Sequence, residues 1–300
     1  MIAWVEPSLG REAMGETPDG WTVAEWPEDA AADPDRERVE FVVPNWEISR
    51  DLGALTGLKV VQARSAGVDW IVDRVPAGVT LCSARGARDA AMAEWVLWAV
   101  LADLKAAGVA AEQQASRTWK HLDLRDLAGA RVLILGHGSI GVAVEERLRP
   151  FEVGEVVRVA RRARDGVHGV DELERLLPAV DVVVNLLPAT PQTNRLFDAR
   201  MLAAMRDGAL LVNAGRGATV DTGALLDALG EGRVRAVLDV MDPEPLPDDH
   251  PLWSAPNVIL TPHSAGDTPG AERAAWALAG EQLRRYAAGE ELLNVVREGY

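Results

Sequence analysis

Val132-Leu-Ile-Leu-Gly-His-Gly-Ser-Ile-Gly141 is the stretch of this chain that decides its fold. Its four apolar residues predict a buried parallel strand, and a G-x-G-x-x-G turn and a helical pattern follow at once. In such a turn the first glycine permits a tight bend, the second lets a pyrophosphate approach the backbone, and the third lets the helix pack close to its strand. We therefore expect a dinucleotide site at Gly136, Gly138 and Gly141, although similar turns also join strands to helices that bind nothing.

Strand-like apolar runs recur on both sides of this stretch. Before it, strands are predicted at 2–5, 39–43, 58–62 and 79–82, with helices at 48–55 and 68–75. After it, strands are predicted at 156–160, 181–187, 209–213, 234–240 and 258–260, with helical patterns such as 170–177 and 222–229. This alternation is typical of parallel sheets. The predicted fold class is α/β, with two Rossmann-like domains, doubly wound parallel sheets and a cleft between the domains.

Two long helical patterns suggest how the chain is divided. The pattern at 87–107 is expected to bridge two domains, and the final helix, 269–288, has no sheet of its own to complete. We therefore predict a discontinuous, flavodoxin-like substrate domain, 1–92 plus 270–300, and a dinucleotide-binding domain, 93–269. Residues 8–35 are so rich in Pro, Gly, Asp and Glu that their structure cannot be assigned from the pattern.

The composition narrows the classes of partner. The net charge of −15 argues against binding to nucleic acid or to an anionic membrane surface. No apolar run is long enough to span a membrane, and the N-terminus lacks the pattern of a signal peptide. Cys82 is the only cysteine, so no internal disulfide can form and a cytoplasmic location is expected. No cluster of histidine and cysteine at ligand spacing suggests a metal.

The end of the strand at 156–160 bears on the choice of cofactor. An acidic residue there would bind the ribose 2′-hydroxyl of NAD, whereas arginine accommodates a 2′-phosphate. Here Ala160 is followed by Arg161 and Arg162. The guanidinium fork matches phosphate oxygens, which favours NADPH over NAD. The alternative is a solvated basic corner.

Polar residues also follow the later strands of the predicted sheet. Arg216, Asp239, Glu244 and His263 each stand at or just beyond a strand end. In a doubly wound sheet these ends face one crevice, where ligands bind. Each residue alone has an ordinary explanation, such as a surface ion pair or a structural histidine. Four together predict a site for hydride transfer.

These residues belong to a wider resemblance. The chain resembles the D-specific 2-hydroxyacid dehydrogenase family over nearly its whole length and is similar in detail to the NADPH-dependent glyoxylate/hydroxypyruvate reductases. The matching stretches are 65–69, Ala93-Glu94, 136–141, 187–193, 213–217, 238–245 and 261–266.

The resemblance implies a role for each matching residue. Arg216 would hold the substrate carboxylate and carbonyl, His263 would be the general acid/base, and Glu244 its partner. Backbone at Ala66 and Gly67 would bind the substrate carboxylate, although 65–69 could equally be an ordinary connecting turn. Asp239 would hydrogen-bond the nicotinamide carboxamide. Further cofactor contacts are implied at Ser139, Ile140, Leu187, Pro188, Thr193, Ala214, Gly215, Ala265 and Gly266.

The implied activity is hydride transfer between NADPH, with NAD as second candidate, and a small 2-oxo acid. Glyoxylate and hydroxypyruvate are the favoured substrates. A nucleotide-sensing, corepressor-like binding protein without turnover is the alternative from another class, and phosphite oxidation is a further one. Formate oxidation is disfavoured because formate dehydrogenases carry glutamine where Glu244 stands.

Two tryptophans extend the resemblance. Trp119 lies in a segment similar to one in glyoxylate/hydroxypyruvate reductases, where a tryptophan reaches the partner subunit's active site; packing at a dimer interface is the alternative. Trp46 follows a predicted strand and either lines the substrate pocket or packs in the core. We expect a homodimer.

Overall fold

The computed structural model describes residues 1–6, 8–30, 32–46 and 50–297. The chain divides into two compact units. The terminal unit contains Met1–Asp89 and Asp267–Tyr300, and the central unit contains Ala90–Gly266. Each unit is built around its own parallel sheet, which confirms the predicted α/β class.

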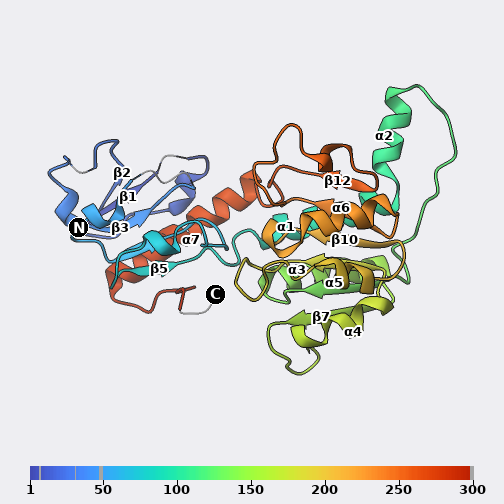
Figure 1. The fold of residues 1–300 in the computed structure, drawn as a ribbon. Coiled ribbons are helices and arrows are strands. Elements are labelled where there is room, and N and C mark those ends of the chain that lie inside the picture. The colour runs from blue at the N-terminus through green and yellow to red at the C-terminus, as the bar shows by residue number, and fades with distance from the viewer. Residues whose placement is uncertain (7, 31, 47–49, 298–300) are drawn as a thin grey trace. The chain divides into compact units, whose positions relative to one another are not determined.

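The terminal unit contains a five-stranded parallel sheet in the order β2-β1-β3-β4-β5 (Figure 1). Its strands are β1 (Ile2–Val5), β2 (Thr22–Glu25), β3 (Val39–Val43), β4 (Val60–Gln62) and β5 (Thr80–Cys82). Helix α7 (Pro269–Ala288) packs on one face of this sheet, because Trp276, Ala279 and Leu283 lie on one side of the helix and share a core with Phe41 and Val43. Cys82 is buried in the same core.

Two local predictions for this unit need correction, and one strand was missed. Strand β2 lies within the stretch whose structure could not be assigned, and no strand was predicted there. The two predicted helices are wrong: the structure has only the 3₁₀ turns η3 (Leu52–Ala54) and η4 (Val72–Arg74) in the described parts of those stretches, and residues 47–49 lie outside the described residues. Gly53, Gly57 and Pro76 are poor helix formers, so neither pattern extends into a full helix. The other 3₁₀ turns of this unit are η1 (Arg11–Met14) and η2 (Arg36–Arg38).

The central unit contains a seven-stranded parallel sheet in the order β12-β11-β10-β9-β6-β7-β8. The strands are β6 (Arg131–Leu135), β7 (Glu155–Ala160), β8 (His168–Gly169), β9 (Val182–Asn185), β10 (Ala209–Asn213), β11 (Val234–Leu238) and β12 (Val258–Leu260). The first strand, β6, lies inside the sheet. Strands β7 and β8 are added on one side of it and β9 to β12 on the other, so the strand order reverses after β8, as in a Rossmann sheet. The short strand β8 was not predicted.

Alternate residues of β6 explain why helices cover both faces of this sheet. Val132 and Ile134 belong to a core that includes residues of α1 and α3, whereas Leu133 and Leu135 belong to a second core with residues of α4, α5 and α6. The helices are α1 (Asp89–Leu104), α2 (Ala107–Ala115), α3 (Ser139–Leu148), α4 (Leu173–Leu176), α5 (Ala199–Ala204) and α6 (Thr222–Gly230). The 3₁₀ turns are η5 (Arg149–Phe151), η6 (Val170–Glu172), η7 (Leu177–Ala179), η8 (Gly217–Thr219) and η9 (Pro251–Ser254).

The predicted bridging helix is shorter than expected. It ends at Leu104, and Ala106 adopts a left-handed conformation, φ 52°, before α2 begins. Helix α2 has no buried residue, and Figure 1 shows it with the extended segment that follows it standing away from the sheet of its own unit. Trp119 lies in that segment and is fully exposed. None of the helices in the described residues has the length and apolar character to span a membrane.

Candidate active site

The phosphate loop between β6 and α3 is shaped by its glycines. Gly136 has a positive φ of 100°, and a Cβ there would lie 3.1 Å from the Leu186 carbonyl carbon. A Cβ on Gly141 would lie only 2.8 Å from the Gly136 carbonyl oxygen, so this glycine lets α3 pack on its strand. A Cβ on Gly138 would meet nothing within 4 Å. The loop therefore offers open space where a pyrophosphate would approach, and Ser139 and Ile140 begin the helix behind it.

A half-buried charged cluster joins this loop to α3 and β7. The His137 Nε2 lies 2.9 Å from the Glu145 carboxylate, and the Arg158 Nε donates a hydrogen bond of 2.7 Å to the same group. The Arg158 guanidinium, helped by His137, lowers the pKa of Glu145 to about 2. His137, at the centre of the loop, is thus fixed through its side chain by helix α3, a contact that the sequence did not reveal.

The tip of β7 carries the arginines that bear on cofactor choice. Arg161 and Arg162 are exposed just beyond Ala160. The neighbouring Arg164 donates a hydrogen bond of 2.8 Å from Nη2 to the His137 carbonyl oxygen. This bond links the basic turn to the phosphate loop, so both belong to one end of the sheet.

Arg216 is positioned by buried amides at the ends of two adjacent strands. The Asn185 Nδ2 donates to the Asn213 Oδ1 at 3.0 Å and to the Thr219 Oγ1 at 2.7 Å. The Thr219 hydroxyl in turn donates to the Arg216 carbonyl oxygen at 2.6 Å. A Cβ on Gly215 would lie 2.4 Å from the Leu187 carbonyl oxygen, so only glycine fits beside Arg216. Buried amides that are fully hydrogen-bonded make this turn rigid.

His263 and Glu244 lie in contact. The His263 Nδ1 is within hydrogen-bond distance of the Glu244 carboxylate. That hydrogen bond raises the pKa of His263 above its ordinary value, while burial and the positive charge of Arg216 act in the opposite direction. The three residues predicted from separate strand ends are therefore close enough to interact electrostatically.

Asp239 holds the loop that carries His263. Its carboxylate accepts hydrogen bonds from the Thr261 hydroxyl at 2.5 Å and from the backbone N–H groups of Ser264 and Ala265, both at 2.9 Å. The Asp239 side chain is almost fully buried, and the His263 N–H donates to the Asp239 carbonyl oxygen at 2.8 Å. This positioning role was not predicted, and the role toward the nicotinamide carboxamide stays a prediction.

The remaining predicted cofactor residues lie on the same unit. Leu187 and Ala214 are almost fully buried, and the Thr193 hydroxyl donates to the Pro188 carbonyl oxygen at 2.6 Å, which closes the loop after β9. Ala265 is buried, and Gly266 is the last residue of the unit. Their contacts with a cofactor stay predictions. The described residues contain no group of three or more His, Cys, Asp or Glu side chains that could hold a metal ion.

Ala66 and Gly67 lie in the terminal unit, in the turn after β4. The Ser65 hydroxyl donates to the Gly67 carbonyl oxygen at 2.6 Å, and the Ser65 carbonyl oxygen accepts from the Ala84 N–H at 2.7 Å. Trp46 is 41% exposed and its ring lies 5.2 Å from that of Trp70, centroid to centroid. Trp46 is therefore not a core residue, and the binding role of the turn stays a prediction.

The family follows from the central unit. Residues 97–265, more than half of the chain, match the model of the NAD binding domain of D-isomer specific 2-hydroxyacid dehydrogenases. The chain belongs to the D-isomer specific 2-hydroxyacid dehydrogenase family. Members of this family are NAD(P)-dependent oxidoreductases that act on CH–OH groups.

Similar family members include enzymes with different names. A glyoxylate/hydroxypyruvate reductase A from Serratia proteamaculans is 35% identical over 74% of this chain and 76% of its own length. A D-isomer specific 2-hydroxyacid dehydrogenase from Xanthobacter autotrophicus Py2, solved with NADPH and MES, is 31% identical with a TM-score of 0.84, covering 98% of both chains. A D-3-phosphoglycerate dehydrogenase from Methanocaldococcus jannaschii is 31% identical over 80% of this chain, which spans only 47% of that longer protein.

The residues that sequence reasoning missed in this 2-hydroxyacid dehydrogenase are those that position others. Asn185, Thr219 and Glu145 fall within or beside predicted strands and helices, where a polar side chain looks unremarkable. One signal was present: Asn185 and Asn213 end two strands that pair in register, so two amides had to meet in an apolar sheet. A buried amide needs a hydrogen-bond partner, and the pairing supplies one.

Proposed function

We propose that this chain is an NADPH-preferring reductase of small 2-oxo acids, with glyoxylate and hydroxypyruvate as its favoured substrates. The observation that carries the proposal is the contact between His263 and Glu244, within electrostatic range of Arg216. A proton donor, its anionic partner and a guanidinium are the groups that reduction of a 2-oxo acid requires. The match to glyoxylate/hydroxypyruvate reductases supports the choice of substrate.

His263 is proposed to supply the proton. Bound NADPH would supply the hydride to the carbonyl carbon, and the carbonyl oxygen would then gain negative charge. Because Nδ1 of His263 is bonded to Glu244, the proton would leave from Nε2. Glu244 stabilises the imidazolium and raises the pKa of His263, so the acid form persists to higher pH than in an unpaired histidine. The product is a 2-hydroxy acid.

Arg216 is proposed to bind the substrate carboxylate and to stabilise the developing oxyanion. The guanidinium offers two parallel donors, which matches a carboxylate. The buried amides behind Arg216 hold its turn before substrate arrives, so binding requires little reorganisation. Backbone N–H groups at Ala66 and Gly67 are proposed to bind the same carboxylate.

NADPH is proposed as the preferred cofactor. The open space over Gly138 and the glycine-shaped loop fit a dinucleotide pyrophosphate. Arg161 and Arg162 stand at the strand tip where NAD-specific proteins carry a carboxylate. The Xanthobacter relative solved with NADPH supports this preference.

A homodimer is proposed as the working form, in a reducing compartment such as the cytoplasm. Helix α2 buries none of its residues within its own unit, and Val109, Trp119 and Leu124 are 49%, 101% and 56% exposed. A short helix without a packed face gains little stability in water, so a second copy would supply the missing contacts. The single, buried Cys82 is consistent with a reducing compartment.

A substrate panel tests the proposed function. Oxidation of NADPH and of NADH is followed by absorbance with glyoxylate, hydroxypyruvate, pyruvate and larger 2-oxo acids, and phosphite is tested in the oxidative direction. We expect the highest kcat/KM with glyoxylate or hydroxypyruvate and NADPH. Absence of turnover with every acid, with NADPH still bound, would instead favour a nucleotide-sensing protein.

A further inference from the structure

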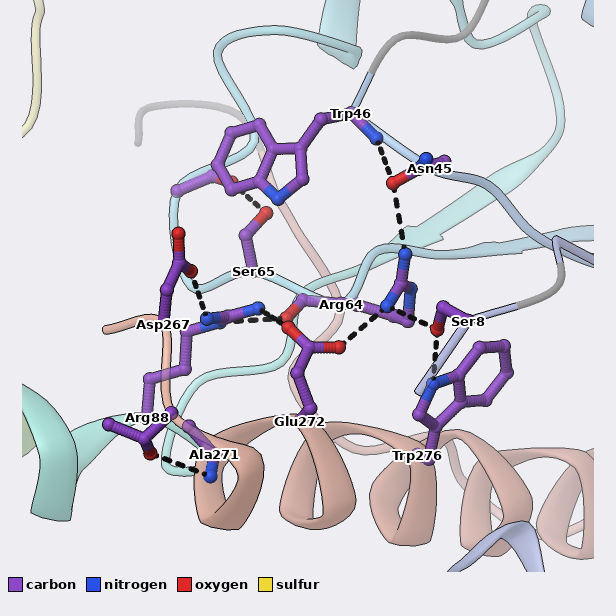
Figure 2. Close-up of polar contacts among 12 residues, drawn as sticks. Ser8, Asn45, Trp46, Arg64, Ser65, Arg88, Asp267, Ala271, Glu272 and Trp276 are labelled. Carbon is purple, nitrogen blue, oxygen red and sulfur yellow. Dashed lines mark hydrogen bonds and ion pairs between the residues drawn. The ribbon is translucent and has the colours of Figure 1, made fainter. Parts of the chain in front are cut away.

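Arg64 is a buried arginine that the proposed reaction does not use. It follows β4 and directly precedes the turn at 65–67. Its Nη1 donates to the Glu272 carboxylate at 2.7 Å and to the Ser8 hydroxyl at 2.9 Å (Figure 2). Its Nη2 donates to the Asn45 Oδ1 at 3.0 Å, and the guanidinium lies 5.0 Å from the Trp276 ring centroid. One side chain therefore joins helix α7 to two other segments of the terminal unit.

Arg88 completes a network around Glu272. Its Nη2 is bonded to the second oxygen of the Glu272 carboxylate, and its Nη1 donates to Asp267 at 2.9 Å. Its Nε donates to the Arg64 carbonyl oxygen at 3.3 Å. Figure 2 shows both guanidinium groups converging on this one carboxylate.

The network is costly to bury. Arg64 is only 6% exposed, and its Nε has no hydrogen-bond partner. Burial lowers the pKa of Arg64, which the Glu272 carboxylate partly offsets. A buried ion pair is rarely more stabilising than apolar packing of the same volume. Stability alone therefore does not account for two buried arginines at this place.

The network instead holds the start of the turn that follows. The Arg88 Nε donates to the Arg64 carbonyl oxygen, which fixes the peptide plane that leads into the turn. Within the turn, the Ser65 carbonyl oxygen accepts from the Ala84 N–H and the Gly67 carbonyl oxygen accepts from the Ser65 hydroxyl, so the network and these local bonds hold the turn together.

Arg64 also fixes the segment that carries Trp46. The Asn45 Oδ1, which accepts from Arg64, also accepts from the Trp46 N–H at 2.9 Å. The Trp46 ring packs on Trp70, and the Trp70 Nε1 donates to the Ser65 hydroxyl at 3.0 Å. Trp46 is thus linked to the turn at 65–67 in two ways. Its backbone is linked through Asn45 to Arg64, and its ring through Trp70 to Ser65.

We propose that Arg64 is a positioning residue, which with Arg88 and Glu272 holds the turn at 65–67 and Trp46 ready for a substrate carboxylate. This proposal rests on the proposed function, because the turn binds substrate only if the chain acts on 2-oxo acids. Arg64 itself contacts neither substrate nor cofactor. Its effect is on substrate binding, whereas the predicted phosphate loop and His263 belong to the central unit.

The Arg64→Lys variant tests the proposal. Lysine keeps the charge, but its single ammonium cannot reproduce the fork that reaches Glu272, Ser8 and Asn45 together. We expect KM for the 2-oxo acid to rise about 10- to 100-fold, with kcat and KM for NADPH changed by less than about threefold. Asn45→Ala removes one contact of Arg64 by changing an exposed residue and leaves Arg64 itself in place. It should raise KM for the acid in the same direction, with a modest fall in Tm because one buried donor of Arg64 loses its acceptor.

Arg284→Lys is the matched control. Arg284 lies on the same helix and donates to the backbone of Met14 and Glu16. Its replacement should lower Tm without raising KM for the acid. If the wild type turns over but both network variants keep its KM, the positioning role is rejected and the proposed function stands. If the wild type has no turnover with any acid, the proposed function itself is rejected, and the positioning role falls with it.

Discussion

His263 is held in place by groups that do not touch the proposed substrate. It has a positive φ of 50°, which is uncommon for any residue other than glycine, although histidine adopts it more often than most. Its N–H donates to the Asp239 carbonyl oxygen, and the Asp239 carboxylate binds the next two residues of the loop. The surrounding hydrogen bonds stabilise a backbone conformation that the loop alone would rarely adopt.

The pairing of His263 with Glu244 predicts a pH dependence. Glu244 raises the pKa of His263, so reduction, which needs the imidazolium, should decline only above the ordinary pKa of 6.5. In Glu244→Gln the pKa falls, and the declining limb of kcat against pH should move to lower pH. His263→Ala should lower kcat about 100- to 10,000-fold at unchanged NADPH affinity.

Steady-state rates across the pH range, with NADPH Kd from fluorescence, provide the measurement. Asp248→Asn is the control, because Asp248 is an exposed carboxylate on the same segment. An unshifted limb in Glu244→Gln would contradict the role of that contact.

The position of Arg161 predicts a preference for NADPH that a single substitution should weaken. Arg161→Ala removes a guanidinium from the tip of β7 and should raise KM for NADPH by about tenfold or more, with KM for NADH nearly unchanged. The exposed Arg149 gives a matched variant, Arg149→Ala, which should alter neither value. Equal losses with both cofactors would show that Arg161 does not contact the 2′-phosphate.

At the scale of elements, short runs rich in apolar residues were the most informative pattern. They placed β1, β3, β10 and β12 at their observed bounds, because apolar residues make up all but one position or every position of each of these strands. The pattern failed for β2, whose residues are partly exposed and lie among turn-forming residues. It also failed at 68–75, where Val68 and Ile71 join the core from the segment just before the 3₁₀ turn η4. The spacing of apolar residues alone does not distinguish a helix from a turn that packs on a sheet.

Helix α3 is joined to the phosphate loop and β7 by Glu145. Glu145→Gln leaves Arg158 without a carboxylate and should lower the free energy of unfolding by about 1–3 kcal/mol at neutral pH. The folded pKa of about 2 lies below the ordinary 4.5, so this stabilisation is present above pH 4.5 and is lost as the pH falls toward 2.

Urea denaturation at several pH values measures the difference. The gap between wild type and Glu145→Gln should narrow as the solution is acidified, whereas the exposed neighbour variant Glu146→Gln should match the wild type. A gap that stays constant down to about pH 3 would contradict the role of this carboxylate.

At the scale of the whole molecule, the sequence predicted two sheets and the family, but the contacts that position the site had to come from the structure. Arg216, Glu244 and His263 could be named because each follows a strand in one sheet. Their supports could not, because Asn185 with Thr219, or Asp239 with Ser264, are distant in sequence and meet only through strand pairing and loop return.

Helix α2, which buries no residue, and the segment after it, which carries the exposed Trp119, predict the assembly state. Light scattering after size exclusion should give twice the mass of one chain, and Trp119→Ala should raise the dimer Kd by at least about tenfold. Trp253→Ala is the control, because Trp253 is 56% exposed elsewhere in the central unit. If Trp119 also reaches the partner's active site, KM for the acid will rise in the remaining dimer. A monomeric wild type would reject the proposed assembly.

The cover that α7 provides for the first sheet has a consequence for biosynthesis. All five strands of that sheet have been synthesised by residue 82, but Trp276, Ala279 and Leu283 are made only after the complete central unit. Phe41 and Val43 therefore wait uncovered while the central unit is translated, and a truncated chain ending before α7 would present this apolar face to chaperones and proteases.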